Sequence, residues 1–395
     1  MKVKRIMVCG SLLLGLVAAT GSLVRGQDLL PPPEANPVPG ESLWYGEFPS
    51  DDAGKKGDYL ACCSPCPQVY GYVEALFLER SNCSADQPIL VQSVAGVPQA
   101  TYLTTSDLDF DYEPAVRALF GVRLHGGWAL EGSYLGLFDA DTSAFIQAPD
   151  AGTNLTFPGE LGFTSNVFED ADKVWTDYSS SLHSGELNLV CCQGCCDCYE
   201  KGKGDAKADC GSYYPQCQTF EWFVGFRYLN LRETLNIYGE REQQIAGGEF
   251  ATESGVYNIR TSNNLYGAQL GARMRHWGRR WGWEATGKAG LFANDAQQEQ
   301  YMLDYPDSPE PFPLRPLVSS STDRVAFIGE LNLNAIYRLN ETWNLRGGYN
   351  LIWVDGLALA PNQLDFSATE DSGHRLSSNG GLFLHGVSCG IEARW

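Results

Sequence analysis

The residues best suited to chemistry in this 395-residue chain are its thirteen cysteines, most of which fall in two groups. Cys191 and Cys195 are four residues apart, as are Cys192 and Cys196, which is dense enough for a metal site. The same density suits disulfides, and the redox state of the compartment decides between the two. Pairing cannot be read from spacing. The disulfide candidates are Cys62, Cys63, Cys66, Cys191, Cys192, Cys195, Cys196, Cys198, Cys210 and Cys217.

The five histidines offer little for catalysis. His374 follows Asp371 and Ser372, but Asp-Ser-Gly-His is ordinary loop composition. No nucleophile elbow, phosphate-binding loop or H-E-x-x-H zinc motif occurs in the chain. We therefore expect no enzyme, no catalytic residue, no cofactor and no metal site.

The charge balance restricts the partners. Acidic residues number 48 and basic residues 28, which gives a net charge of −20 and argues against nucleic acid. Acidic residues are concentrated in 139–178 and in 295–323. These segments could attract cations to a vestibule or bind divalent ions bridging to lipid headgroups. They could also serve solubility alone, which is the simpler interpretation.

The N-terminus has the features of a secretory signal. Lys2, Lys4 and Arg5 precede an apolar stretch over 6–19, which is too short to span a membrane as a helix. Cleavage after Gly26 gives a signal peptide over 1–26 and a Pro-rich periplasmic linker over 27–67. Export implies an oxidising compartment, so disulfides are favoured over zinc at the cysteines. It also implies the export and barrel-assembly machinery as partners.

From residue 68 onwards the sequence alternates between apolar and polar positions, which indicates β-strands. In 116–124, for example, Val116, Phe120 and Val122 share one face, while Arg117 and Arg123 take the other. Ten such strands are predicted, with two more if a long loop contains a hairpin. The predicted strands are 69–79, 116–124, 128–138, 182–190, 220–233, 265–274, 281–293, 324–338, 343–353 and 381–395.

Connection lengths and tryptophans favour a membrane barrel over a soluble sandwich. Short turns alternate with long connections, as in outer-membrane barrels. The long connections are expected at roughly 80–113, 139–181, 238–256, 295–323 and 355–380. Trp128, Trp222, Trp281, Trp283, Trp343 and Trp395 all fall at one end of the strands, as an interfacial aromatic girdle requires. We therefore predict an all-β fold, an antiparallel transmembrane barrel of ten to twelve strands over 68–395. It has short periplasmic turns, long acidic extracellular loops and a Cys-rich periplasmic insertion at 191–218. The expected location is the bacterial outer membrane, with its lipid as a partner.

Several segments, taken in order, resemble the β-barrel porin family described from planctomycete bacteria, whose function is unassigned. They are Tyr72–Leu78, Trp128–Tyr134, Gly225–Leu229, Asn264–Gly271 and Leu382–Val387. The resemblance covers about Val69 to Trp395. It implies an outer-membrane barrel and brings no catalytic residues.

Two functions stay open. A passive pore for ions or small solutes would be lined by the polar row of the strands. A closed structural or adhesive barrel would use the same side chains as a paired internal network, since small barrels usually have filled interiors. No protein partner can be named. The expected lumen-lining residues are Arg117, Arg123, Glu131, Glu186, Glu284, Lys288, Glu330 and Arg346.

Overall fold

A computed structural model gives the fold of the chain. It describes residues 67–83, 86–94, 97–124, 127–149, 154–159, 167–194, 217–244, 248, 250–278, 280–305 and 311–395. The predicted signal peptide, the linker up to residue 66 and most of the Cys-rich insertion (195–216) lie outside these residues and stay predictions. Among the described residues, no helix has the length and apolar character needed to cross a membrane.

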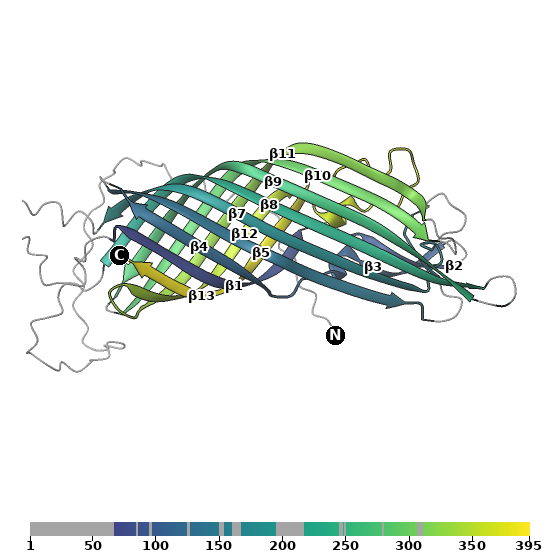
Figure 1. Ribbon diagram of the computed structural model, residues 1–395, viewed down its shortest axis with the longest axis horizontal. Helices are drawn as coiled ribbons and strands as arrows, with labels where there is room; N and C mark the ends of the chain where they lie inside the picture. Colours follow the sequence, from purple (N-terminus) through teal and green to yellow (C-terminus); the bar gives the residue numbers. More distant parts are fainter. Residues whose placement is uncertain are drawn as a thin grey trace, which may run out of the picture. The chain divides into compact units, whose positions relative to one another are not determined.

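Ten antiparallel strands close into a barrel in the order β1-β13-β12-β11-β10-β9-β8-β7-β5-β4 (Figure 1). The ten-to-twelve-strand antiparallel barrel predicted from the sequence is therefore confirmed. The strands are β1 (Val69–Cys83), β4 (Glu113–Arg123), β5 (Trp128–Gln147), β7 (Lys173–Gly194), β8 (Cys217–Gln244), β9 (Phe250–Trp277), β10 (Trp281–Tyr305), β11 (Phe312–Arg338), β12 (Trp343–Leu357) and β13 (Gly380–Arg394).

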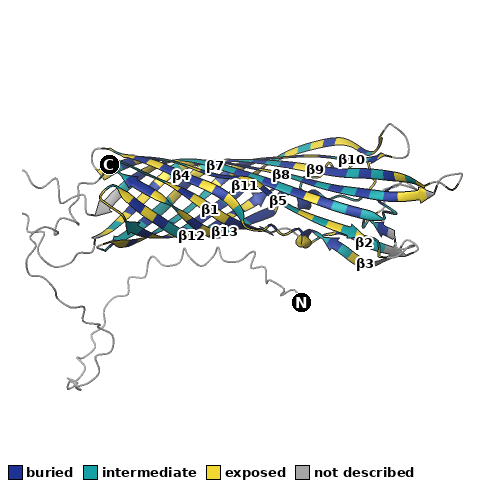
Figure 2. Cartoon of the chain, turned by 60° about the horizontal axis from the view of Figure 1, so that its bottom comes forward, coloured by how far each residue is buried: buried dark blue, intermediate teal, exposed yellow. Residues whose placement is uncertain are grey.

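The outward face of the barrel is apolar towards the periplasmic ends of the strands, because alternate residues point to opposite faces of a strand. Exposed and buried residues alternate there along each strand (Figure 2). Phe120, Leu187 and Leu345 are all exposed, while their neighbours Leu119, Asn188 and Arg346 are buried. In water these exposed apolar rows would be unfavourable, whereas in lipid they are the expected surface. The predicted tryptophan girdle is present at this periplasmic end: Trp222, Trp281, Trp283, Trp343 and Trp395 are exposed and Trp128 is half-buried.

Six neighbouring strands, β5 and β7–β11, continue beyond the membrane-spanning part and are much longer than the alternation predicted. Their outer parts are here called the extension. β8 and β9 each have 28 residues, although 9–11 suffice to cross a bilayer. The expected loop over 238–256 is therefore largely a continuation of these two strands, and 295–323 likewise continues β10 and β11. The physical reason is that outward residues in this extension face water. Without a lipid-facing apolar row, the alternation that marks a strand disappears.

A small sheet lies in the extracellular connections. β2 (Pro88–Val94) pairs with β3 (Val97–Thr104) and with β6 (Asn154–Thr156), in the order β3-β2-β6. The short 3-10 helix η1 (Thr105–Asp107) follows β3, and η3 (Ala360–Gln363) lies between β12 and β13. The hairpin considered for a long loop does exist in 80–113, but it belongs to this sheet and adds no strand to the barrel.

Candidate functional site

The eight residues predicted to line the lumen all lie on inward positions of the barrel wall. The structure brings all eight together into two ion-pair clusters and a third, smaller group, and none carries an exposed side chain. Those below 9% exposure are Arg117, Glu131, Glu284, Glu330 and Arg346, while Arg123, Glu186 and Lys288 are half-buried.

Glu330 on β11 is the centre of the first cluster. Its carboxylate lies 2.9 Å from the Arg117 guanidinium, 2.9 Å from that of Arg227 and 3.1 Å from Lys288 Nζ. Lys288 also contacts Glu186, at 2.9 Å. These residues come from five different strands, so the cluster joins opposite walls of the barrel. Burying a charge is costly unless it is paired, and here each one is paired.

Arg346 on β12 is the centre of the second cluster. Its three guanidinium nitrogens contact Glu74 at 2.9 Å, Glu284 at 2.8 Å and Glu392 at 2.7 Å. The same guanidinium lies 4.2 Å from the ring centre of Tyr72, a cation–π contact. The planar Arg fork therefore has a carboxylate for each nitrogen and an aromatic ring on its face.

A third group lies near the periplasmic end. Arg273 contacts Glu131 at 2.8 Å and Glu221 at 2.9 Å, and the Tyr70 hydroxyl donates a hydrogen bond to Glu131 at 2.6 Å. Arg123 approaches Glu221 at 3.5 Å. The sequence predicted Glu131 and Arg123 as lining residues, but it did not predict their partners Arg273 and Glu221.

At the periplasmic mouth, the indole of Trp277 is 7% exposed. Arg338 and Arg394 both lie 4.9 Å from its ring centre, and Arg275 lies 5.8 Å from it. Arg394 also contacts Glu392 at 2.5 Å. An aromatic ring surrounded by arginines therefore lies on the inward face at this end of the barrel.

Sequence reasoning missed nearly half of this network. The signal was available, because all the missed residues except Arg275 lie between apolar or aromatic neighbours, as Arg227 does between Phe226 and Tyr228. The periplasmic half of the described lumen contains seven carboxylates and eight cations in ion pairs, so it is nearly neutral. The missed residues are Glu74, Glu221, Arg227, Arg273, Arg275, Glu392 and Arg394.

The space left inside this network is small. A cavity of about 20 Å³ lies between Arg117, Glu131, Lys288 and Glu330. A water molecule needs at least about 10–15 Å³ measured in this way, so the cavity has room for a single water. Side chains therefore leave little room between these four residues at the level of the ion pairs.

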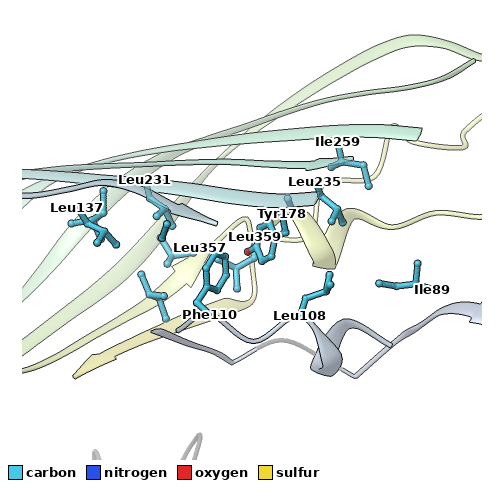
Figure 3. Packing of buried hydrophobic residues seen from close by; sticks show 14 of the residues in the cluster. Ile89, Leu108, Phe110, Leu137, Tyr178, Leu231, Leu235, Ile259, Leu357 and Leu359 are labelled. Carbon is cyan, nitrogen blue, oxygen red and sulfur yellow. The ribbon is translucent and has the colours of Figure 1, made fainter. Parts of the chain in front are cut away.

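Directly above the ion pairs, the interior becomes apolar. Inward residues of the upper membrane-spanning part and of the extension form one contiguous cluster, part of which is drawn in Figure 3. Members below 5% exposure include Leu76, Leu135, Leu229, Leu231, Leu235, Ile259, Ile328, Ile352, Leu357, Leu359 and Leu384. An ion entering from outside would have to lose its hydration among these side chains.

The connection between β12 and β13 forms part of this filling. The Asn263 amide donates to the Ala358 carbonyl at 2.9 Å, and its oxygen accepts from the Ala358 amide at 2.8 Å. Glu233 accepts from the Ala360 amide at 2.8 Å and also pairs with buried Arg80. Residues 358–379, here called the plug loop, are thus held against β8 and β9.

The outer half of the plug loop is held by polar side chains. Arg315 donates to Gln300 at 2.8 Å, to the Tyr257 hydroxyl at 3.0 Å and to the Ser367 carbonyl at 2.9 Å. Asp365 accepts from the amides of Ser367 and Gly373. Burial alone would raise the pKa of Asp365, but these donors and Arg315 hold it below its usual range. Gly373 has φ +80°, a conformation that favours glycine.

The pKa of Asp304, in the extension, is shifted in the opposite direction to that of Asp365. Asp304 lies near the outer end of β10, close to Glu253 and Arg241, which pair with each other. Burial and the negative charge of Glu253 raise the pKa of Asp304 from 3.8 to about 6. This carboxyl group would therefore titrate between neutral and mildly acidic pH.

The other candidates for chemistry are not assembled into a site in the described part of the chain. The histidine rings of His183 and His385 hydrogen-bond to Tyr134 and Tyr349, at 2.8 and 2.9 Å, on the outward face. His374 is exposed, and its backbone amide donates to the Asp371 carbonyl. No described group of three His, Cys, Asp or Glu side chains could hold a metal ion.

The predicted disulfides are mostly beyond the described residues. Cys62, Cys63, Cys66, Cys195, Cys196, Cys198 and Cys210 lie outside, and nothing can be said of the Cys192 and Cys217 side chains. Cys191 forms no disulfide with another described residue, and its pairing with the remaining candidates stays a prediction. It lies on the outward row between Trp128 and Trp222. Cys389 is free and exposed.

A closed antiparallel barrel with apolar outward rows, an aromatic girdle and a polar lumen defines an outer-membrane β-barrel protein. A family model agrees: Putative beta barrel porin-7 (BBP7) matches residues 83–395. The chain belongs to this family, which confirms the resemblance found in the sequence and locates the protein in the bacterial outer membrane.

Solved structures show weaker similarity. The outer-membrane protease OmpT of Escherichia coli has 8% identity and a TM-score of 0.40, over 83% of this chain and 96% of that one. A FadL homologue of Pseudomonas aeruginosa has 8% identity and a TM-score of 0.25, over 83% and 90%. The toluene transporter TodX of P. putida has 7% identity and a TM-score of 0.21, over 86% and 94%. At these values neither the protease nor the transporters indicate an activity for this chain. No curated protein matches the chain in sequence.

Proposed function

We propose that this protein is a closed, non-conducting barrel that anchors an extracellular platform in the outer membrane. The observation that carries the proposal is the interior, in which paired charges fill the lumen and an apolar layer covers them. The platform is the extension of β5 and β7–β11 together with the small sheet and the plug loop.

The pairing makes an ionic pathway unfavourable. A passing cation would have to replace Arg117, Arg227 or Lys288 at Glu330, and each contact is about 3 Å long or shorter. Separating a buried pair leaves an uncompensated charge, which costs about 3–5 kcal/mol. The layer above adds a second barrier, because most of its inward side chains are apolar and its buried charges Arg80 and Glu233 are paired with each other.

The pore remains the competing function, and its support is the mixed-sign row that a channel could also use. It would require the arginines and carboxylates to line a continuous water-filled path. A cavity with room for one water does not favour it. A catalytic role is not part of the proposal, because the rings of His183, His276 and His385 contact tyrosine or tryptophan rather than carboxylates.

Liposome swelling tests the proposal for uncharged solutes. Purified full-length protein is reconstituted, and the liposomes are diluted into isotonic arabinose or glucose. We expect swelling no faster than in protein-free liposomes. The matched variant removes the centre of the first cluster by the substitutions Arg117→Ser, Arg227→Ser and Glu330→Ser, and tests whether the assay detects an opened lumen. Swelling by the wild-type protein would overturn the proposal in favour of the pore.

A further inference from the structure

The lipid-facing surface ends at a pair of tyrosines on β8 and β9. Going outward on β8, the exposed residues Trp222, Val224 and Phe226 lead to Tyr228. Tyr228 lies directly across from Tyr266, and the two rings stack with centres 5.2 Å apart. The Tyr228 hydroxyl donates to Asn264 at 3.0 Å. Tyrosines with a polar end of this kind mark the membrane–water interface.

Two arginines follow on the same outward rows. Arg232 comes four residues after Tyr228, and Arg260 comes six residues before Tyr266, and both are exposed. With about 3.3 Å of rise per residue and a tilt of about 40°, they lie roughly 10 and 15 Å above the tyrosines. Because long side chains can bend back towards the interface, both guanidinium groups can reach lipid headgroups.

The two arginines are diagonal neighbours. Arg232 pairs in register with Ser262, and Arg260 pairs with Thr234, so the two lie on adjacent strands with a two-residue offset. Diagonal neighbours of this kind are about 7–8 Å apart, which is within the reach of long side chains. Their guanidinium groups can therefore contact one common anion.

In the described part of the chain, neither guanidinium takes part in an ion pair or a hydrogen bond. Lys173, further out on β7, behaves differently, because its ammonium lies 3.8 Å from Glu240 and 4.0 Å from Glu242. Arg232 has Ser181 and Ser262 as cross-strand neighbours, whereas Arg260 has Glu299 on its β10 side. In a chain of net charge −20, these two adjacent exposed arginines form no ion pair with a described residue, although Glu299 lies beside Arg260, so a further counter-charge would be favourable.

We propose that Arg232 and Arg260 form a binding site for the phosphate of an anionic lipid headgroup in the outer leaflet. Arginine binds phosphate in a bidentate manner, and one phosphate between the two guanidiniums relieves their mutual repulsion. The lipid is favoured over a free ion because the site lies directly above the tyrosine pair. The acyl chains of a lipid bound there would run down the apolar rows of β8 and β9. Arg232 contributes more than Arg260, because Glu299 partly offsets the charge of Arg260.

Native mass spectrometry of the detergent-solubilised full-length protein tests this site. The probes are phosphatidylglycerol, which is anionic, and phosphatidylcholine with the same acyl chains, which is net neutral. We expect the wild-type protein to retain phosphatidylglycerol preferentially. Arg232→Gln and Arg260→Gln should each reduce that preference, by about fivefold for a cation near an anionic surface, with the larger loss at Arg232.

Arg280→Gln is the matched control, because Arg280 is exposed at the opposite, periplasmic end of the barrel. It should keep the preference of the wild-type protein. An unchanged preference in the Arg232→Gln/Arg260→Gln double variant would overturn the proposal. Displacement of phosphatidylglycerol by millimolar inorganic phosphate would also overturn it, because the site would then bind a free ion. Both arginines are exposed, so circular dichroism should show the double variant folded like the wild-type protein.

Discussion

The two halves of the barrel interior are filled by different chemistry. The half near the periplasm contains ion pairs around Glu330 and Arg346, whereas the outer half contains leucine, isoleucine and aromatic side chains with the plug loop among them. The ionic half uses side chains of the barrel wall alone. The apolar half needs an inserted segment, because the wall on the β12, β13, β1 and β4 side is shorter there.

This difference shows how each half holds its structure. In the ionic half, Glu330 and Arg346 are each fixed by several partners from other strands, so removing either one leaves buried charges unpaired. In the outer half, the plug loop is held by hydrogen bonds and apolar contacts that can be lost singly. The ionic half should therefore control global stability, and the outer half should control local opening.

The largest effect is expected at the centre of the first cluster. Glu330→Ala leaves Arg117, Arg227 and Lys288 with unbalanced charge in a buried space. We expect a loss of about 3–5 kcal/mol in the free energy of unfolding, measured by urea titration in detergent micelles. Asp323→Asn on the same strand removes an exposed acidic group and should change the stability by less than about 0.5 kcal/mol. Equal losses in the two variants would show that the buried ion pairs contribute no more to stability than an exposed charge does.

A smaller effect is expected where the plug loop meets the wall. Asn263→Ala removes both hydrogen bonds to Ala358 and the contact with the Asn294 amide at 3.0 Å. Unsatisfied buried groups of this kind cost about 1–3 kcal/mol. The cost should appear as faster hydrogen exchange in residues 358–379, with global unfolding much less affected. Thr234→Ala, on the outward face of β8, is the control. Unchanged exchange in 358–379 would mean that apolar packing alone holds the plug loop.

The smallest effect concerns pH. The raised pKa of Asp304 means that the fold favours its protonated form, so this contribution is complete below about pH 3.8 and is lost as pH rises through about 6. The neighbouring charges are those of Glu253 and Arg241, and Arg241 in turn acts on Asp170. We expect amides of 167–172 to be better protected at pH 5 than at pH 7, after correction for intrinsic exchange rates. Asp304→Asn should remove the difference, and a difference that persists would assign it to another group.

The sequence predicted the barrel well because the lipid requires apolar side chains on the outward face, at every second position of a strand. Val116, Phe120 and Leu187 reveal their strands by alternating with polar residues, and the opposite face gives the lumen positions. Where water replaces lipid, as along Arg241 to Glu253, that rule no longer applies, and the strands of the extension were expected as loops.

The contacts inside the lumen were harder to predict than its composition. Alternation places Glu330 and Arg227 inside, but only the closed barrel brings them together from β11 and β8. The plug loop could not be predicted, because Asn263 and Ala358 are 95 residues apart and 358–379 has no periodic pattern. Its anchors are single amide and carboxylate groups without a recognisable motif.

Single-channel recording in planar lipid bilayers tests the closed interior most directly. Full-length wild-type protein is compared with a variant that carries Arg117→Ser, Arg227→Ser and Glu330→Ser and has the plug loop replaced by a short Gly-Ser linker. The account predicts no conductance steps for the wild-type protein and steps for the variant, in which both the ionic layer and part of the apolar layer are removed. Regular conductance steps from the folded wild-type protein would contradict the closed barrel and establish a pore.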